Sequence, residues 1–286
     1  MKPVWILRAL AIASACAAAL AETPPIDTPV AVINATVVRA DGVRIDKGII
    51  LIEQGKIVAV GREVRLPAGT RRIDADGAVA YPGFVSAFAR EGVIAPPASE
   101  EQERRYESWF PSISDTPQAQ TVAANRLGIH ARRHVRDLLT IEDKTFAKLR
   151  SAGFAAALLA PPRAIFGGEA AVAELHDGPV RDALLTVDVA QTASFAVPSR
   201  KIAERSRYPG TLLGVVAQMR QVVSDARWYA RMREYVAAHP SETLPPDADL
   251  TALARVLEER RLLLWEADSA DEIHRVLDLC EEFGVR

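Results

Sequence analysis

The stretch Tyr81-Pro-Gly-Phe-Val-Ser-Ala-Phe-Ala-Arg90 joins two parts of the chain that have different residue patterns. Before it, over 30–79, short segments rich in β-branched residues alternate with turn dipeptides such as Asp41-Gly42, a pattern typical of β-hairpins. After it, longer helical patterns alternate with brief, continuous apolar runs, which is typical of a parallel sheet or barrel covered by helices. The sequence therefore predicts an α/β fold in which a small β-module precedes a larger unit of strands and helices.

Individual elements follow from the same patterns. In the β-module we expect short strands and one hairpin turn, with strands over 30–38, 48–52, 57–61, 64–67 and 72–74 and the turn at 53–56. In the larger unit we expect strands over 154–159, 184–189 and 262–265, and helices over 127–139, 141–152, 212–236, 250–260 and 270–283. The Pro-, Ser-, Glu- and Gln-rich residues 95–120 predict a long surface loop, and Phe166-Gly-Gly-Glu169 predicts a turn.

The first 21 residues have the features of a secretory signal peptide. Lys2 and Arg8 precede an uncharged apolar run over 9–21, which ends in Ala19-Leu-Ala21 and is too short to span a bilayer. We therefore expect export to the periplasm or the medium, with cleavage after Ala21; a lipid anchor on Cys16 or a buried N-terminal helix are the alternatives. Cleavage leaves Cys280 as the single cysteine, so the exported chain has no internal disulfide.

Composition excludes several classes of protein. The chain has 286 residues, of which 49% are hydrophobic and 25% charged, with a net charge of −2. These values exclude global disorder and give no excess of positive charge for binding nucleic acid, so no nucleic-acid partner is expected. No span beyond the signal segment is apolar enough to cross a membrane. The sequence contains no G-x-S-x-G, Walker or C-x-x-C motif that would indicate another catalytic class.

Several motifs occur in a characteristic order around the join. They are Ile52-Glu-Gln-Gly-Lys-Ile-Val-Ala-Val-Gly61, Leu66-Pro67, Ile73-Asp-Ala75, Gly77 and Tyr81-Pro-Gly-Phe-Val85, followed much later by Ala270-Asp-Glu-Ile273 and Glu281-Glu-Phe-Gly284. This order resembles the amidohydrolase superfamily, and most closely the imidazolonepropionase-like, composite-domain type of metal-dependent hydrolase. The resemblance implies a partial TIM-type (β/α) barrel over 81–286, preceded by a small β-sandwich-like module over 22–80 that strands returning from the C-terminus complete.

The same resemblance implies a cofactor and a chemistry. Its members hold one or two divalent metals such as zinc and hydrolyse C–N bonds in non-peptide or peptide-like substrates. Their H-x-H pair, which binds metal at the end of the first barrel strand, follows a PGFID motif. In this chain Ser86 replaces the Asp of that motif, and Phe88 and Arg90 occupy the two histidine positions. Phenylalanine offers no ligand atom and a guanidinium repels a cation.

The second metal motif of that superfamily, HAHRADDI, is also altered. It reads Glu266-Ala-Asp-Ser-Ala-Asp-Glu-Ile273, so Glu266 and Asp268 stand at the histidine positions. Carboxylates bind hard cations, and these two residues are therefore candidate ligands for a different metal; the alternative is a pair of solvated acids before a helix. His130 and His134 would share one face of the predicted helix and form another candidate metal pair, with a surface pair as the alternative. The sequence assigns no catalytic residue.

Two functions from different classes follow. The first is an exported amidohydrolase-like hydrolase that acts on C–N bonds. The second is a non-catalytic pseudoenzyme that binds a ligand or accompanies an active paralogue, which would account for the altered ligands at both motifs. A small-molecule or peptide-like ligand and a homo- or hetero-oligomer are left open. A complete (β/α)8 barrel takes about 250 residues, so we also expect the chain to be a fragment of a longer protein.

Overall fold

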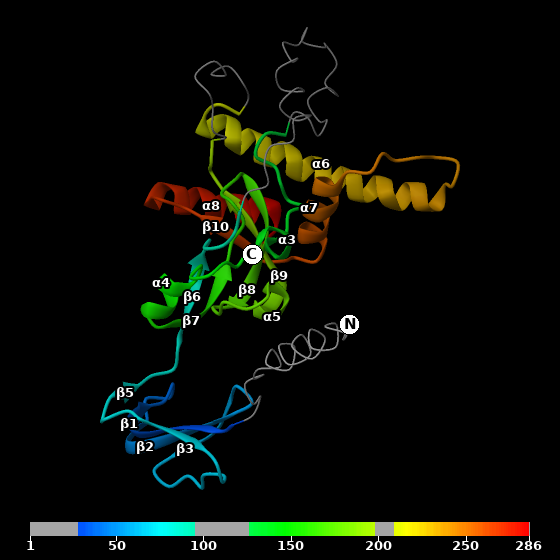
Figure 1. Cartoon of the computed structure of the whole chain (residues 1–286). Helices are drawn as coiled ribbons and strands as arrows, with labels where there is room; N and C mark the ends of the chain where they lie inside the picture. Colours follow the sequence, from blue (N-terminus) through cyan, green and yellow to red (C-terminus); the bar gives the residue numbers. More distant parts are fainter. Residues whose placement is uncertain (1–27, 95–125, 198–208, 286) are drawn as a thin grey trace, which may run out of the picture. The chain divides into compact units, whose positions relative to one another are not determined.

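The computed structural model describes residues 28–94, 126–197 and 209–285. These residues divide after Pro82 into two compact units (Figure 1), and each unit is described by itself. The predicted signal segment 1–21 and the predicted loop 95–120 lie outside the described residues. Among the helices within the described ranges, none has the length and apolar character that a membrane span requires.

The first unit is a single five-stranded sheet. Its strands are β1 (Val30–Val38), β2 (Arg44–Glu53), β3 (Lys56–Gly61), β4 (Arg71–Asp74) and β5 (Val79–Ala80). The strand order is β3-β2-β1-β4, and β5 also pairs with β1. β1 is antiparallel to β2 and parallel to β4 and β5. The predicted strands of this module are confirmed except for 64–67, which is irregular. Within the described residues the module is therefore a sheet, and its expected sandwich-like form stays a prediction.

The β2–β3 hairpin shows why these residues form a tight turn. Gln54 and Gly55 have φ values of 50° and 72°, and Glu53 pairs with Lys56 across the turn. Two central residues with positive φ define a turn whose twist matches that of the strands it joins. The sheet has a small buried core, formed by Ala31, Ala35, Val37 and Leu51, whereas Ile57, Val58 and Ile73 are exposed.

The second unit contains another five-stranded sheet, which curls into a half-barrel. Its strands are β6 (Phe84–Ala89), β7 (Phe154–Leu159), β8 (Phe166–Glu174), β9 (Leu184–Ser194) and β10 (Leu263–Glu266), in the order β10-β9-β8-β7-β6. β6 is parallel to β7, and β9 is parallel to β10, but β8 is antiparallel to both of its neighbours. The expected parallel sheet is therefore present only in part, because β8 runs against its neighbours. The short connection 160–165 forms a hairpin because a parallel crossover needs a dozen or more residues.

β8 is a strand where the sequence predicts a turn. Its glycine pair is needed for close packing: a Cβ on Gly168 would lie 2.4 Å from the carbonyl oxygen of Arg133, and one on Gly167 would lie 2.6 Å from Thr192 Oγ1. Gly168 also has a φ of 122°. Glycine inside a strand often marks such a close approach of another backbone.

The segment that approaches β8 is the region predicted as a helix over 127–139. It instead runs beside the start of β8, with backbone hydrogen bonds from His130 N to Phe166 O (2.7 Å) and from Glu169 N to Arg133 O (2.8 Å). Only α3 (Val135–Leu138) is helical there, and the helix predicted over 141–152 is reduced to α4 (Ala147–Ser151). Backbone pairing to a distant strand has overridden local helix propensity.

The remaining helices are α5 (Val180–Ala183), α6 (Leu212–Ala238), α7 (Ala248–Glu258) and α8 (Ala270–Phe283). The last three confirm the sequence prediction. Each begins at a side-chain cap, with Thr211, Asp247 and Ser269 accepting a backbone N–H, and α8 ends at Gly284, which has a φ of 67°.

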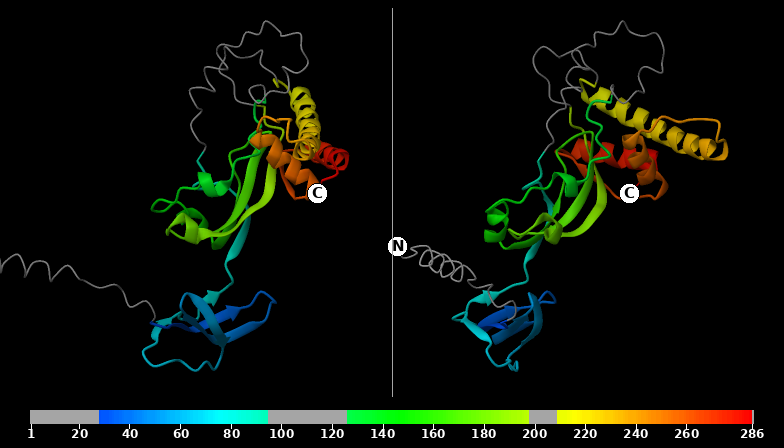
Figure 2. Two further views of the ribbon diagram at one scale, coloured as in Figure 1. Left: turned by 90° about the vertical axis from the view of Figure 1, so that its right-hand side faces the viewer. Right: turned by 45° about the vertical axis from the view of Figure 1, so that its right-hand side comes forward.

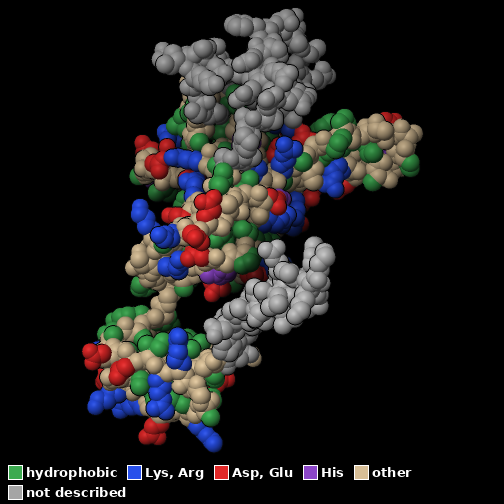
Figure 3. Space-filling view, viewed as in Figure 1, with side chains coloured by type: hydrophobic (Ala, Val, Ile, Leu, Met, Phe, Trp, Pro, Cys, Tyr) green, Lys and Arg blue, Asp and Glu red, His purple; other side chains and the backbone are tan. Residues whose placement is uncertain are grey.

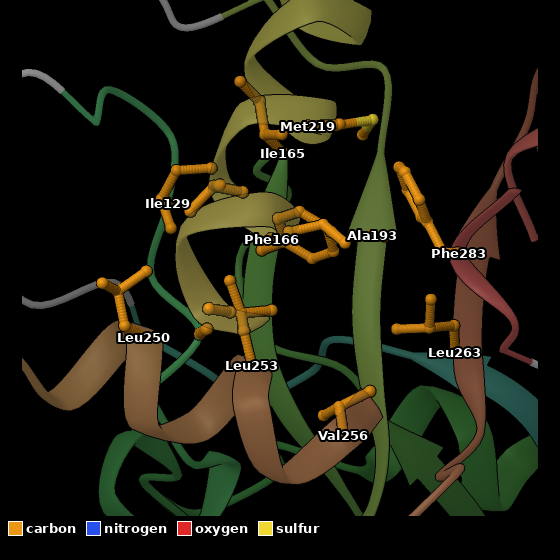
Figure 4. Close-up of a cluster of buried hydrophobic side chains, with 14 of the residues drawn as sticks. Ile129, Ile165, Phe166, Ala193, Met219, Leu250, Leu253, Val256, Leu263 and Phe283 are labelled. Carbon is orange, nitrogen blue, oxygen red and sulfur yellow. The ribbon is translucent and has the colours of Figure 1, made fainter. Parts of the chain in front are cut away.

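These three helices gather against the part of the sheet that contains β9 and β10 (Figure 2). The hydrophobic cluster between them brings Met219 of α6, Leu253 of α7 and Phe283 of α8 against Phe166 and Leu263 of the sheet (Figure 4). A second cluster, around Phe146 and Leu159, packs α3 and α4 against the other end of the sheet. Together the two clusters fix the strand ends that carry the candidate site.

Candidate functional site

Charged side chains gather where the parallel strands of the half-barrel end. Arg90 directly follows β6, Arg163 lies in the connection after β7, Glu266 is the last residue of β10, and Asp268 lies just before α8. Parallel strands end at the same edge of a sheet, and in α/β barrels this edge carries the functional residues. We call these four residues the ion-pair network.

Arg90 and Glu266 form the centre of the network. Arg90 Nη2 donates a hydrogen bond to Glu266 Oε1, and Arg90 Nε donates to the carbonyl oxygen of Pro161 at 3.1 Å. The Arg90 guanidinium also lies over the Phe88 ring, 4.7 Å from its centroid. The Glu266 side chain is 17% exposed and that of Arg90 is 33% exposed, so the pair is half-buried.

Arg163 extends the network toward α8. Its Nη2 donates to Asp268 Oδ2 at 2.7 Å, and its Nε lies 3.9 Å from Glu266 Oε2. The hydrogen bond to Asp268 raises the pKa of Arg163, and the charges of Asp268, Glu266 and Glu272 act in the same direction against the effect of burial. Two guanidinium groups, one just after β6 and one in the connection after β7, therefore lie near the two oxygens of Glu266.

The positions of the two altered metal motifs are thus brought together, but not as a metal site. Phe88 and Arg90 bring no ligand atom, and Ser86 Oγ donates to the Phe88 carbonyl oxygen at 2.9 Å. Glu266 and Asp268, the candidate ligands, are each engaged by a guanidinium. In the described parts of the chain, no three His, Cys, Asp or Glu side chains group so as to hold a metal ion. The residues present do not fit the divalent metal that the superfamily resemblance implies.

His130 and His134 lie in separate surroundings. Because their segment is not helical, they do not share a helix face. Burial lowers the pKa of His130 to about 4, with the positive charges of Arg133 and Arg132 contributing in the same direction, so this imidazole is neutral near pH 7. His134 instead contacts a carboxylate, because its Nδ1 lies 2.6 Å from Asp188 Oδ1.

His134 belongs to a second polar cluster, most of whose members the sequence does not single out. Arg136 Nη1 donates to Asp188 Oδ2 at 2.7 Å, and Arg261 Nη1 donates to Glu169 Oε1 at 2.6 Å. Burial raises the pKa of Asp188, but the hydrogen bonds and charges of His134 and Arg136 outweigh this effect, and the pKa is lowered.

Glu169 is the most buried acid in this second cluster, with 3% of its surface exposed. Burial raises the pKa of Glu169, although the charge of Arg261 opposes the shift. Within the described residues its Oε2 has no hydrogen-bond partner. Arg261 also donates a hydrogen bond to the Asp188 carbonyl oxygen, and its two bonds link the segment before β10 to β8 and β9.

Simple sequence signals could have found part of these sites. Arg163 follows the predicted strand 154–159 and two prolines, where a charged residue reaches the carboxyl edge of the sheet. Asp188 interrupts an apolar run and has a φ of 54°, a conformation that no sequence pattern identifies. On the face drawn in Figure 3, basic and acidic side chains of the second unit lie interspersed, which agrees with these many pairs.

Comparisons with known proteins give a fold but no family. No family model matches the chain, and no curated protein matches it. Among solved structures, an amidohydrolase from Thermotoga maritima MSB8 is similar over 90% of this chain, with a TM-score of 0.68 and 20% sequence identity. The chain spans 63% of that protein's length. A prolidase complexed with N-methylphosphonate-L-proline matches over 47% of this chain and 26% of its own, with 16% identity and a TM-score of 0.26. The chain therefore has an amidohydrolase-type fold.

Proposed function

We propose that this chain is an amidohydrolase-type protein without metal-dependent catalysis, which binds a ligand at the carboxyl edge of its half-barrel or accompanies an active paralogue. The observation that carries this proposal is the ion pair between Arg90 and Glu266. The pair joins one position from each altered metal motif. A permanently charged guanidinium therefore stands at a ligand position of the metal ion that the superfamily resemblance implies.

Electrostatics support the proposal. A divalent cation at this edge would have to displace Arg90 from Glu266 and Arg163 from Asp268, and would then face two guanidinium charges nearby. None of these four residues is a histidine, so the network offers no imidazole nitrogen as a metal ligand. Two arginines and two carboxylates already balance each other, so the network has no excess negative charge to attract a metal.

Metal analysis of the purified protein tests this proposal. After incubation with zinc or manganese and removal of free ions, we expect far less than one metal per chain by elemental analysis, and no hydrolysis of dipeptides or cyclic amides. Stoichiometric metal that is lost in Glu266→Ala or Asp268→Ala, but retained in the control Glu282→Ala, would contradict it. Glu282 is a suitable control because it forms a surface pair with Arg220 on α6 and α8, outside the network.

A hydrolase of C–N bonds in non-peptide or peptide-like substrates is the second candidate. Two observations favour it: the fold similarity to an amidohydrolase, and the position of the charged residues at the edge that carries active sites in barrels. Turnover of a dipeptide or cyclic amide by the wild-type protein, abolished by Glu266→Gln, would establish this candidate in place of the first. Export through residues 1–21 and assembly into a homo- or hetero-oligomer are proposed for either function, whereas an active paralogue as partner belongs to the non-catalytic one alone.

A further inference from the structure

We infer that Arg90 and Arg163 form a binding site for the carboxylate group of a small organic ligand, at which the Glu266 side chain is the intramolecular occupant. This inference rests on the proposed ligand-binding function. Arg90 directly follows β6 and Arg163 lies in the connection after β7, and both guanidinium groups face the Glu266 carboxylate, Arg90 at Oε1 and Arg163 at Oε2. A carboxylate in this position shows that the space between the two arginines accepts that group.

Arg90 keeps its position by contacts that do not involve Glu266. Its Nε donates to the Pro161 carbonyl oxygen, and its guanidinium lies over the Phe88 ring. A hydrogen bond and a cation–π contact restrict a side chain that would otherwise have many rotamers. The arginine therefore remains oriented when another carboxylate takes the place of Glu266, and less entropy is lost on binding.

The network is also accessible and has open donors. The side chains of Arg90 and Arg163 are 33% and 40% exposed, and within the described residues neither Nη1 has a hydrogen-bond partner. Asp268, which holds Arg163, is 71% exposed. Exposed ion pairs contribute little stability, so Arg163 can exchange Asp268 or Glu266 for a ligand at small cost.

The neighbouring charges favour a carboxylate over a phosphate. Asp268 and Glu272 lie beside Arg163, and the Asp268 backbone N–H already donates to Glu272 Oε2 at 2.7 Å. Their negative charges repel a dianion more strongly than a planar monoanion. A carboxylate also matches the two-pronged geometry of a guanidinium, as Glu266 does within the chain.

Calorimetric titration of the purified protein with glycyl-glycine tests the inference, with acetate, glycyl-glycinamide and inorganic phosphate as comparison ligands. We expect glycyl-glycine to bind and the amide not to bind. If acetate binds with the same affinity as glycyl-glycine, the carboxylate alone is recognised. Glu266→Ala removes the internal competitor and should bind glycyl-glycine about tenfold more tightly, whereas Arg163→Met should bind it about tenfold more weakly. Because Glu266→Ala opens a space that could prevent folding, Glu266→Gln is a second variant with the same expected direction.

Controls separate site effects from general charge effects. Glu282→Ala removes an acid from a surface arginine pair elsewhere and should leave the dipeptide affinity unchanged. Three results would each overturn the inference. They are equal affinity for the acid and the amide, an equal gain in glycyl-glycine affinity in Glu266→Ala and Glu282→Ala, and tighter binding of phosphate than of glycyl-glycine. These results do not depend on metal content or hydrolysis, so the proposed function can stand or fall separately.

Discussion

Arg90 and Glu266 are joined by a hydrogen-bonded ion pair, although they lie at the ends of the two opposite edge strands of the same sheet. Arg90 follows β6 and Glu266 ends β10, with three strands between them. The contact is therefore a direct consequence of the curl of the sheet, which brings the carboxyl ends of its outer strands together. The ion pair connects the two edges of the sheet at their carboxyl ends.

The first prediction concerns the contribution of this pair to stability. Arg90→Met leaves the half-buried Glu266 without its partner, and we expect it to lower the free energy of unfolding by about 1–2 kcal/mol. The double variant with Glu266→Gln should recover part of the loss, giving a coupling energy of about 1 kcal/mol in urea denaturation. The Arg220→Met and Glu282→Gln pair is the matched control, and its coupling should be smaller because both side chains are exposed. Equal coupling in the two cycles would show that the edge-to-edge pair has no special role.

A second prediction follows from His130. Its pKa is lowered from 6.5 to about 4 in the folded chain, so between these values the unfolded state binds a proton that the folded state does not. Stability should therefore fall as the pH decreases from about 6.5 toward 4, by roughly 1–3 kcal/mol from this residue. Denaturation of wild type and His130→Gln at several pH values tests this. The variant should lose less stability than wild type between pH 6.5 and 4. If the free energies of unfolding of the two proteins change in parallel with pH, His130 is not the cause.

The third prediction concerns Gly168. A Cβ there would meet the Arg133 carbonyl oxygen and strain a backbone with a φ of 122°, so Gly168→Ala should cost about 2 kcal/mol or more. Gly284→Ala is the control, because it also has a positive φ but has open space around its Cβ position; about 1 kcal/mol is expected. Similar losses in thermal unfolding for both variants would mean that the close approach of Arg133 is relieved by movement of the segment.

The fourth prediction concerns the N-terminus, which lies outside the described residues. Expression in a bacterium with a secretory pathway should give a mature chain that begins at Glu22 and is recovered from the periplasm or medium. Intact-mass measurement gives the cleavage position. A variant without the apolar run over 9–21 should stay in the cytoplasm, and its mass should be that of the uncleaved variant. Export of this variant would disprove the signal peptide.

Local signals predict the elements whose ends are determined by nearby residues. The strand 154–159 and the helix 270–283 have the predicted limits, because Gly153 and the two prolines flank the first, while Ser269 and Gly284 cap the second. The predictions for β8 and for the segment 127–139 are wrong for a shared reason. β8 pairs with β7 and β9, and the segment 127–139 bonds to the start of β8 across a sequence distance that no local pattern reports.

The candidate site is likewise predictable from the sequence in part. The resemblance to the amidohydrolase superfamily singles out positions 86, 88, 90, 266 and 268, because they stand in its metal motifs, the first at the Asp position and the other four at the histidine positions. What these residues do together depends on the curl of the sheet, which local sequence does not encode. Arg163, which the motifs do not include, completes the network because the β7–β8 hairpin turns back at the same edge.

The antiparallel placement of β8 has a consequence for how the second unit folds. β7, β8 and β9 are consecutive in the chain and adjacent in the sheet, so they can pair early at a low entropic cost of loop closure. β6 and β10 join from far along the chain, and the Arg90–Glu266 contact spans 176 positions. We expect this contact to form after the rate-limiting step, so Arg90→Met should accelerate unfolding and leave the refolding rate nearly unchanged.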